Sequence, residues 1–369
     1  MIDPRPTQAS PRTIGVEEEV ILLEPDTLSP IDVADEVIGE LVDLDASASW
    51  ITHEFLRAQL EFSSPVLADG DAAERVVRAF RDVLSQAAAR RSLIPASVGT
   101  AHGRGASSTA EGDRYLRFDT ELGAIRPDHQ IQGLHVHVAI ASREEGVAIM
   151  RALRPWLAPL LALTANSPSF AGADTGFASW RTMIGRRFTT ASAPPIFADA
   201  EDYERRILAL VGVGTTFDTA SLAWMMRLAE RWPTIELRLF DAQLSAGETV
   251  ATALLSRALV EVAAAGGLPH AEAAAQPELV DAAIWHAARH GLDDGLVDPT
   301  TARLAPAWEV IDRMVEAARP ALRAAEDEQR VDALLARVRT EGNGATRQRA
   351  ALSGGDAALG RMLRESFIA

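Results

Sequence analysis

Three consecutive carboxylates stand in the middle of an apolar, β-branched segment, residues 13–25 (TIGVEEEVILLEP). In an extended chain successive side chains point to opposite faces, so Glu17 and Glu19 share one face and Glu18 lies on the other. Burying neighbouring carboxylates without partners is unfavourable. The segment is therefore either a strand with one face exposed to water or a strand whose carboxylates bind cations.

Three further strand-like segments place charged or imidazole groups on one face and aliphatic residues on the other. They are residues 50–65 (WITHEFLRAQLEFSSP) with Glu54 and Glu61, residues 133–140 (GLHVHVAI) with His135 and His137, and residues 234–240 (TIELRLF) with Glu236 and Arg238. A single polar site built on one β-sheet explains all four segments, which favours the cation-binding interpretation of the first.

The residue types indicate which cations such a site would hold. The chain has no cysteine, so thiolate metal sites, disulfides and a sulfur nucleophile are excluded. Carboxylate oxygens with one or two imidazoles suit Mg²⁺ or Mn²⁺ better than zinc. Several carboxylates exceed what one Mg²⁺ needs, so we expect two or three ions, shared with the phosphates of a nucleoside triphosphate.

Arginines supply further positive charge for phosphate binding. Arg238, two residues after Glu236, is placed to neutralise a γ-phosphate during transfer. The irregular segment 166–190 contains Arg181 and Arg187, which either form a solvated surface or, beside an acidic metal site, bind carboxylate or phosphate through paired hydrogen bonds. The chain has no GxxxxGK[ST] or GxGxxG motif, so its phosphate binding must rely on metals and arginines.

The composition is that of a globular enzyme with a large core, since 47% of the 369 residues are hydrophobic and 24% are charged. A net charge of −16 argues against a nucleic-acid-binding surface, which needs clustered lysine and arginine. Residues 1–10 (MIDPRPTQAS) lack an apolar signal core, and no run approaches the roughly 20 apolar residues of a membrane span. We therefore expect a cytoplasmic protein with neither a nucleic-acid nor a membrane partner.

The chain is expected to consist of a short arm and one long domain. Residues 1–11 are Pro-rich and typical of a flexible arm. Residues 12–369 are expected to form a single catalytic domain, of which the Ala-rich part 247–369 is mostly helical. Further elements predicted from periodicity and capping are helices over 32–44, 71–91 and 142–165 and a short strand over 92–99.

Eight motifs follow one another along nearly the whole chain: TIGVEEEVILLEP, ITHEFLRAQLEFSSPV, GLHVHV, RPWLAPLLALTANSP, DTGFASWRT, TIELRLFDAQ, ARHGLDDGLVDP and GNGATRQR. Together they strongly resemble the glutamate-cysteine ligase type 2 family, also called YbdK-type carboxylate-amine ligases. The resemblance implies an α+β fold like that of glutamine synthetase, in which a curved, mainly antiparallel sheet forms a catalytic funnel with helices packed outside. It also implies an ATP-dependent ligase that forms an amide bond of the γ-glutamylcysteine type through an acyl phosphate, releasing ADP and phosphate.

The resemblance also implies roles for individual residues. They are Mg²⁺ ligands at Glu17, Glu19, Glu54, Glu61, His137 and Glu236, nucleotide contacts at His135, His137, Arg187 and Arg238, and catalytic contacts to phosphate or substrate carboxylate at Arg181 and Arg238. Which of His135 and His137 faces a metal stays open.

Two segments depart from the family pattern on the side where the substrates would bind. Residues 224–230 (WMMRLAE) keep an arginine but lack the family's acid and prolines, and residues 184–188 (IGRRF) lack its tryptophans. The expected substrates are therefore a small carboxylate and a small amine, without glutamate and cysteine being carried over. The alternative function is a metal-dependent hydrolase of an amide or phosphoester, since the same carboxylate–histidine cluster can activate water. We also expect a homo-oligomer, a dimer.

Overall fold

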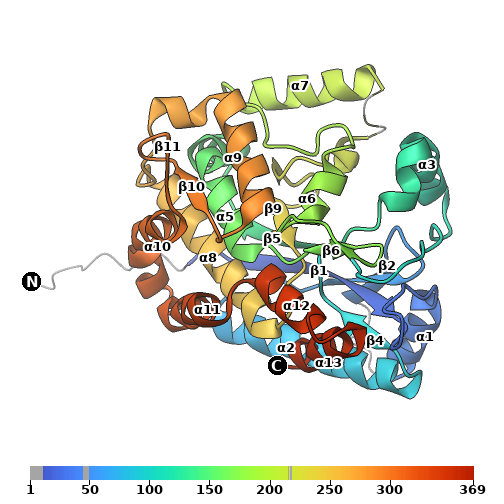
Figure 1. Ribbon diagram of the computed structural model, residues 1–369. Helices are drawn as coiled ribbons and strands as arrows, with labels where there is room; N and C mark the ends of the chain where they lie inside the picture. The colour runs from blue at the N-terminus through green and yellow to red at the C-terminus, as the bar shows by residue number, and fades with distance from the viewer. Residues whose placement is uncertain (1–10, 45–49, 215, 217) are drawn as a thin grey trace, which may run out of the picture.

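The computed structural model describes residues 11–44, 50–214, 216 and 218–369 (Figure 1). Residues 1–10 of the expected N-terminal arm therefore lie outside the described residues. Within them, one seven-stranded sheet has the order β2-β3-β1-β5-β9-β8, and β4 also pairs with β1. Its strands are β1 (Ile14–Leu23), β2 (Ile51–His53), β3 (Gln59–Ser63), β4 (Ile94–Ala96), β5 (Gly133–Ala139), β8 (Met226–Leu228) and β9 (Thr234–Asp241).

Strand β1 lies in the middle of the sheet and pairs antiparallel with β3, β4 and β5. Val16, Glu18 and Val20 are buried on one face of β1, and alternation puts Glu17 and Glu19 on the other face. The remaining pairs of the sheet are antiparallel as well. The prediction that all four polar segments belong to one antiparallel sheet is confirmed.

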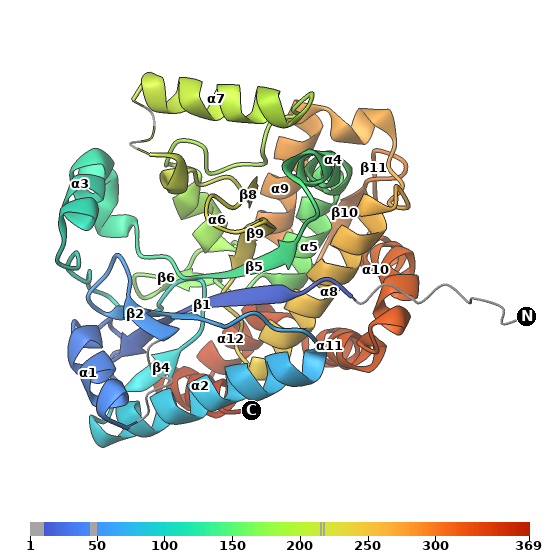
Figure 2. The same cartoon turned by 180° about the vertical axis from the view of Figure 1, so that it is seen from behind.

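Helices cover the apolar face of the sheet (Figures 1 and 2). Helix α8 (Ala246–Ala264) lies against β1 and β5. Four helices pack around it: α2 (Gly70–Arg90), α4 (Arg143–Leu153), α10 (Ala307–Ala324) and α11 (Glu328–Glu341). Nearly every residue of α8 is buried, and its mixture of alanine and larger apolar residues lets other helices pack on several sides. The Ala-rich part of the chain thus begins with the central helix of the core.

The other elements complete the layers and the rim. The helices are α1 (Ala34–Leu44), α3 (Asp113–Leu122), α6 (Trp180–Gly185), α7 (Ala200–Gly212), α9 (Pro277–His290), α10 (Ala307–Ala324), α11 (Glu328–Glu341), α12 (Gly344–Leu352) and α13 (Asp356–Phe367). Two short antiparallel pairs are β6 (Ser169–Phe170) with β7 (Ala173–Asp174) and β10 (Gly295–Asp298) with β11 (Arg303–Pro306). Segment 166–190, expected to be irregular, thus contains β6, β7 and α6.

The helix predicted over 142–165 is in fact two helices. Ser142 caps α4 (Arg143–Leu153) by accepting a hydrogen bond from Glu145 N at 3.1 Å. Pro155 interrupts the regular helix because it has no N–H, and a 3₁₀ turn leads into α5 (Leu157–Thr164). Contrary to the sequence expectation, the stretch Arg143–Thr164 has the length and composition of a membrane span, but 83% of its most apolar window is buried inside the protein. It is part of the core.

A buried ion pair joins β1 to the helices behind it. Glu18 is 0% and Arg81 of α2 is 1% exposed, and the guanidinium donates to both oxygens of the carboxylate. Ser97 Oγ and Thr249 Oγ1 also donate to Glu18 Oε1, at 2.9 and 2.8 Å. The guanidinium further donates to the carbonyl oxygens of Gln243, Leu244 and Phe367. Both charges are therefore surrounded by hydrogen bonds, the condition under which a buried pair is tolerated.

Removing one partner of this pair should strongly destabilise the fold. In Arg81→Met the Glu18 carboxylate stays buried without its counter-charge, so we expect the free energy of unfolding to fall by about 3–5 kcal/mol. Arg91→Met is the control, because Arg91 makes a partly exposed pair with Glu40 and should be nearly neutral. Urea denaturation measures both variants, and equal losses would contradict the role given to the buried pair.

Candidate active site

The register of the sheet brings six predicted residues into one row. The cross-strand pairs are Glu61 of β3 with Glu19 of β1, Glu17 of β1 with His135 of β5, and His137 of β5 with Glu236 of β9. These side chains lie on the face opposite to Glu18 and the helices behind it. We call this set, together with Glu54 beside Glu19 and Glu61, the carboxylate row.

Glu17 lies between the two histidines of β5. Its Oε2 is 3.1 Å from His135 Nδ1, and its Oε1 is 3.2 Å from His137 Nε2. Burial raises the pKa of Glu17, but the contacts with the two imidazoles outweigh burial and hold the pKa well below its usual range. Burial and the nearby Arg238 lower the pKa of His135, which favours its neutral form.

Glu236 is held between two arginines. Arg227 of β8 donates to Glu236 Oε2 at 2.6 Å, and Arg238 donates to Oε1. Burial raises the pKa of Glu236, but Arg238 and Arg227 outweigh it and lower the pKa far below its usual range. His137 Nε2 is 3.9 Å from Oε1, the oxygen that Arg238 occupies. A cation bound at this oxygen therefore competes with Arg238.

At the other end of the row the carboxylates are crowded together. Burial and the charge of Glu19 raise the pKa of Glu54, which directly follows β2, to about 7. Burial and the charges of Glu54, Glu17 and Glu19 raise the pKa of Glu61 well above its usual range. Neighbouring buried carboxylates disfavour each other's ionised form, and a cation between them removes this penalty.

Arg181 is positioned by a buried network beneath it. Ser179 caps α6 and donates to Asp241 at 2.9 Å, and Ser167 donates to Asp241 at 2.7 Å. Ser167 Oγ in turn accepts from Arg181 N at 3.0 Å. The Arg181 guanidinium donates to two carbonyl oxygens of β9 at 3.2 and 3.4 Å, one of them that of Arg238. The Arg181 guanidinium therefore contacts the backbone of Arg238, the other predicted catalytic arginine.

Arg187 lies farther from the row. Its Nη1 donates to Asp128 Oδ2 at 2.8 Å, and its side chain is 37% exposed. It lines a neighbouring hollow of about 350 Å³ rather than the cavity that contains Arg181 and Arg238. Its predicted contact with the nucleotide stays a prediction.

Part of the row borders a cavity of about 240 Å³, and Glu17, Glu61, His137 and Glu236 are not among the residues that line it. The predicted site residues that line it are Glu19, Glu54, His135, Arg181 and Arg238. Aromatic side chains also line the cavity and were not identified from the sequence; this aromatic wall consists of Phe55, Tyr115, Phe118, His129 and Phe188. These side chains come from loops and from the short helix α3, where no strand periodicity marks them.

His129 is a histidine within the aromatic wall. It packs against the rings of Phe55 and Phe118 at centroid distances of 6.0 and 5.7 Å. It also lines the cavity. Burial, with Arg187 and Arg181 nearby, lowers its pKa to about 4, so it is a neutral member of the aromatic wall.

The row contains two overlapping sets of possible metal ligands. One set is Glu17, His137 and Glu236 and the other is Glu17, Glu61 and His135, with ligand atoms within 4.8 Å of one another in each set. Two carboxylates and one imidazole per set suit Mg²⁺ or Mn²⁺. Among the described residues, His137 Nε2 is buried without a hydrogen-bond partner of good geometry. The side chains of the row therefore fit divalent cations.

The chain has relatives with assigned families. A profile of Glutamate-cysteine ligase family 2 (GCS2) matches residues 13–365. A Saccharopolyspora erythraea protein provisionally named glutamate–cysteine ligase 2-1 is 36% identical over 339 residues, which cover 91% of this chain and 89% of the relative. A similarly named protein of Salinispora arenicola is 37% identical over 339 residues, with the same shares of 91% and 89%.

Two solved structures share the fold at low sequence identity. One is a glutamate–cysteine ligase from Francisella tularensis in complex with AMP, with a TM-score of 0.72, 11% identity, and coverage of 98% of this chain and 90% of the other. The second is a bifunctional glutathione synthetase from Pasteurella multocida, with a TM-score of 0.67, 14% identity, and coverage of 97% and 51%. The predicted α+β fold is confirmed. With the family profile spanning nearly its whole length, the chain belongs to glutamate-cysteine ligase family 2 and is a carboxylate–amine ligase.

Proposed function

We propose that the protein joins a small carboxylic acid to a small amine, using ATP and passing through an acyl phosphate. The observation that carries this proposal is the carboxylate row, whose members Glu19 and His135 line one cavity together with Arg238 and Arg181. Membership in a ligase family supports the reaction class. The AMP bound to the Francisella tularensis ligase is in keeping with a nucleotide site in this fold.

The proposed reaction has two steps. A carboxylate oxygen of the acid attacks the γ-phosphorus of ATP, the bond from that phosphorus to the β–γ bridging oxygen breaks, and ADP leaves. The amine nitrogen then attacks the acyl carbon, the carbon–oxygen bond to the phosphoryl group breaks, and phosphate leaves with the electron pair while the nitrogen loses a proton.

Different residues of the site have different roles in this reaction. Mg²⁺ held by the row would neutralise phosphate charge and tie the nucleotide to the sheet; the proposed ligands are Glu17, Glu19, Glu54, Glu61, His137 and Glu236. Arg238 stabilises the charge that develops on the transferred phosphoryl group. Arg181 orients the acid, and among the described residues its Nε has no hydrogen-bond partner.

The aromatic wall contributes by excluding water. An acyl phosphate hydrolyses in water, so a ligase must keep the intermediate dry until the amine arrives. Phe55, Phe118 and Phe188 line the same cavity as Glu19 and His135 of the carboxylate row. The expected dimer and the cytoplasmic location stay predictions.

ADP release tests the proposal. We expect Mg²⁺-dependent ADP release when the protein is supplied with a suitable pair from a panel of amino acids and small amines, and none when either substrate is omitted. Hydroxylamine in place of the amine should trap the activated acid as a hydroxamate. Cleavage of an amide or phosphoester without nucleotide would contradict the ligase proposal and support the hydrolase alternative.

Glu19→Gln tests the metal role of the row. Glu19 Oε2 accepts hydrogen bonds from Gln59 Nε2 at 3.1 Å and Gly133 N at 2.6 Å, and a glutamine oxygen can keep an acceptor there. We expect Mg²⁺-dependent ATP binding, measured by calorimetry, to weaken about tenfold or more. The melting temperature without metal should stay the same or rise, because a charge beside Glu54 is lost. Unchanged nucleotide affinity, equal to that of the surface control Glu40→Gln, would remove Glu19 from the site.

Arg238→Lys tests the catalytic role of Arg238. Lysine keeps the charge but loses the planar fork, so we expect turnover to fall by roughly 10²–10³-fold while ATP affinity changes little. If Arg238 serves only to hold Glu236, the variant should instead lose thermal stability and bind ATP poorly. Steady-state kinetics and melting curves, with the exposed Arg205→Lys as control, separate the two roles, and a stable variant with near-normal turnover would refute catalysis by Arg238.

A further inference from the structure

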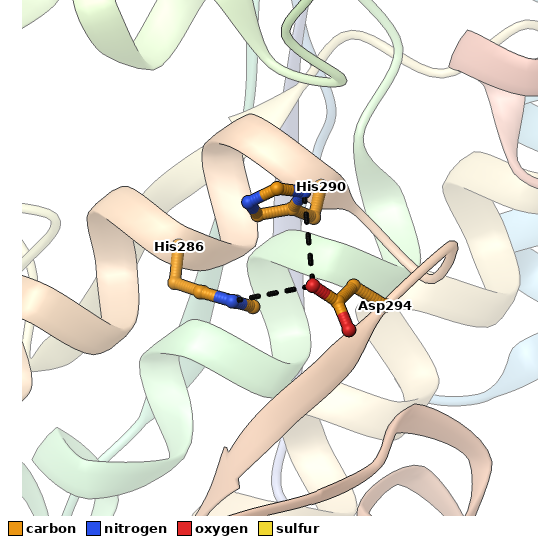
Figure 3. A group of neighbouring side chains, drawn as sticks. All are labelled: His286, His290 and Asp294. Atoms are coloured by element: carbon orange, nitrogen blue, oxygen red, sulfur yellow. Dashed lines mark ion pairs between the residues drawn. The ribbon is translucent and has the colours of Figure 1, made fainter.

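A second group of metal-ligating side chains lies at the end of α9, outside the active-site cavity (Figure 3). His286 and His290 are four residues apart and therefore lie on the same face of the helix, one turn from each other. Gly291, with a positive φ of 57°, ends the helix and turns the chain so that Asp294 comes back beside it. Figure 3 shows both imidazoles next to one carboxylate oxygen of Asp294.

The three ligand atoms are already close to one another. His286 Nε2 and His290 Nδ1 are 3.7 and 4.0 Å from Asp294 Oδ2. Ligand atoms around a tetrahedral Zn²⁺ with bonds of about 2.0–2.1 Å are about 3.3 Å apart. The two histidine nitrogens would therefore have to move about 0.4 and 0.7 Å closer to Asp294 Oδ2, and all three ligand atoms already lie within 4.8 Å of one another.

The surroundings hold these groups in place. Gly295 N donates to Asp294 Oδ1 at 2.7 Å, which leaves Oδ2 to face the histidines. The C-terminal end of a helix carries partial negative charge and favours a cation. Two nearby arginines are engaged elsewhere. Arg186 pairs with Asp281, and the Arg289 guanidinium stacks on Phe177 with its carbon 5.1 Å from the ring centroid.

We propose that His286 Nε2, His290 Nδ1 and Asp294 Oδ2 bind a divalent transition-metal ion of the zinc type. Two imidazoles and one carboxylate are the ligand set for such an ion, whereas the carboxylate row suits Mg²⁺. The side chains of His286, His290 and Asp294 are 24%, 35% and 54% exposed, so water has access to the remaining coordination position.

The place of this site in the fold indicates a structural role. The carbonyl oxygen of Ala288, in the last turn of α9, accepts hydrogen bonds from Ala178 N at 2.8 Å and Ser179 N at 2.9 Å. Ser179 caps the helix that begins with Trp180 and Arg181. An ion bound at the end of α9 would therefore stabilise the last turn of this helix, to which the segment before Arg181 is hydrogen-bonded.

Zinc binding by the metal-free protein tests the proposal, with competition against a chromophoric zinc chelator as the measurement. The experiment uses a Glu17→Gln background, which removes the residue that both ligand sets of the row share. We expect one equivalent of Zn²⁺ with a Kd on the order of micromolar or below. His286→Gln with His290→Gln should weaken this binding by at least about 100-fold, and the exposed control His270→Gln should leave it unchanged.

Co²⁺ provides a second readout that reports the ligands directly. Its visible absorption bands should appear with the background protein and disappear with the double histidine variant. Melting curves of both proteins check that they remain folded. Two outcomes would overturn the proposal. One is a Zn²⁺ affinity that is the same with and without the two histidines, and the other is a Kd of the background protein for Zn²⁺ weaker than about 0.1 mM.

Discussion

The buried pair of Glu18 and Arg81 is the interaction on which the geometry of the site depends. Side chains alternate along a strand, so fixing Glu18 toward the helices fixes Glu17 and Glu19 on the opposite face of the sheet. A register slip of one residue would invert all three, and would leave the Arg81 guanidinium buried without a carboxylate. Because Arg81 also donates to the carbonyl oxygens of Gln243, Leu244 and Phe367, the same pair ties β1 to the chain before α8 and to the C-terminal helix.

The carboxylate row is electrostatically asymmetric. Glu17 and Glu236 have imidazole or guanidinium partners that lower their pKa values, whereas Glu54 and Glu61 have mainly other carboxylates beside them and raised pKa values. The crowded end gains most from a divalent cation, since that end carries the unrelieved repulsion. The paired end already holds Arg238 next to the position where a phosphoryl group is expected. The row thus has a crowded end that most needs a cation and a paired end where Arg227 and Arg238 already balance the charge of Glu236.

The sheet and its polar face were predictable because alternation is a local signal. The pattern around Glu17, His135 and Glu236 sufficed to put these residues on one face, and the structure adds the register that makes them neighbours. The aromatic wall was missed because Tyr115, Phe118 and His129 come from a helix and loops whose meeting depends on the whole fold. The break at Pro155 was missed because the apolar periodicity continues through it, although the missing N–H was visible in the sequence.

The two hydrogen bonds at the Ala288 carbonyl give α9 an influence beyond its own packing. This helix supplies no side chain to the lining of the cavity. Its last turn nevertheless accepts hydrogen bonds from Ala178 and Ser179, in the segment that leads to Arg181. A substitution that tilts α9 by a small angle moves the arginine that is proposed to orient the acid, without altering any contact surface for substrate. Selectivity among acids can therefore change, in evolution or by design, through substitutions in α9 that lie outside the cavity.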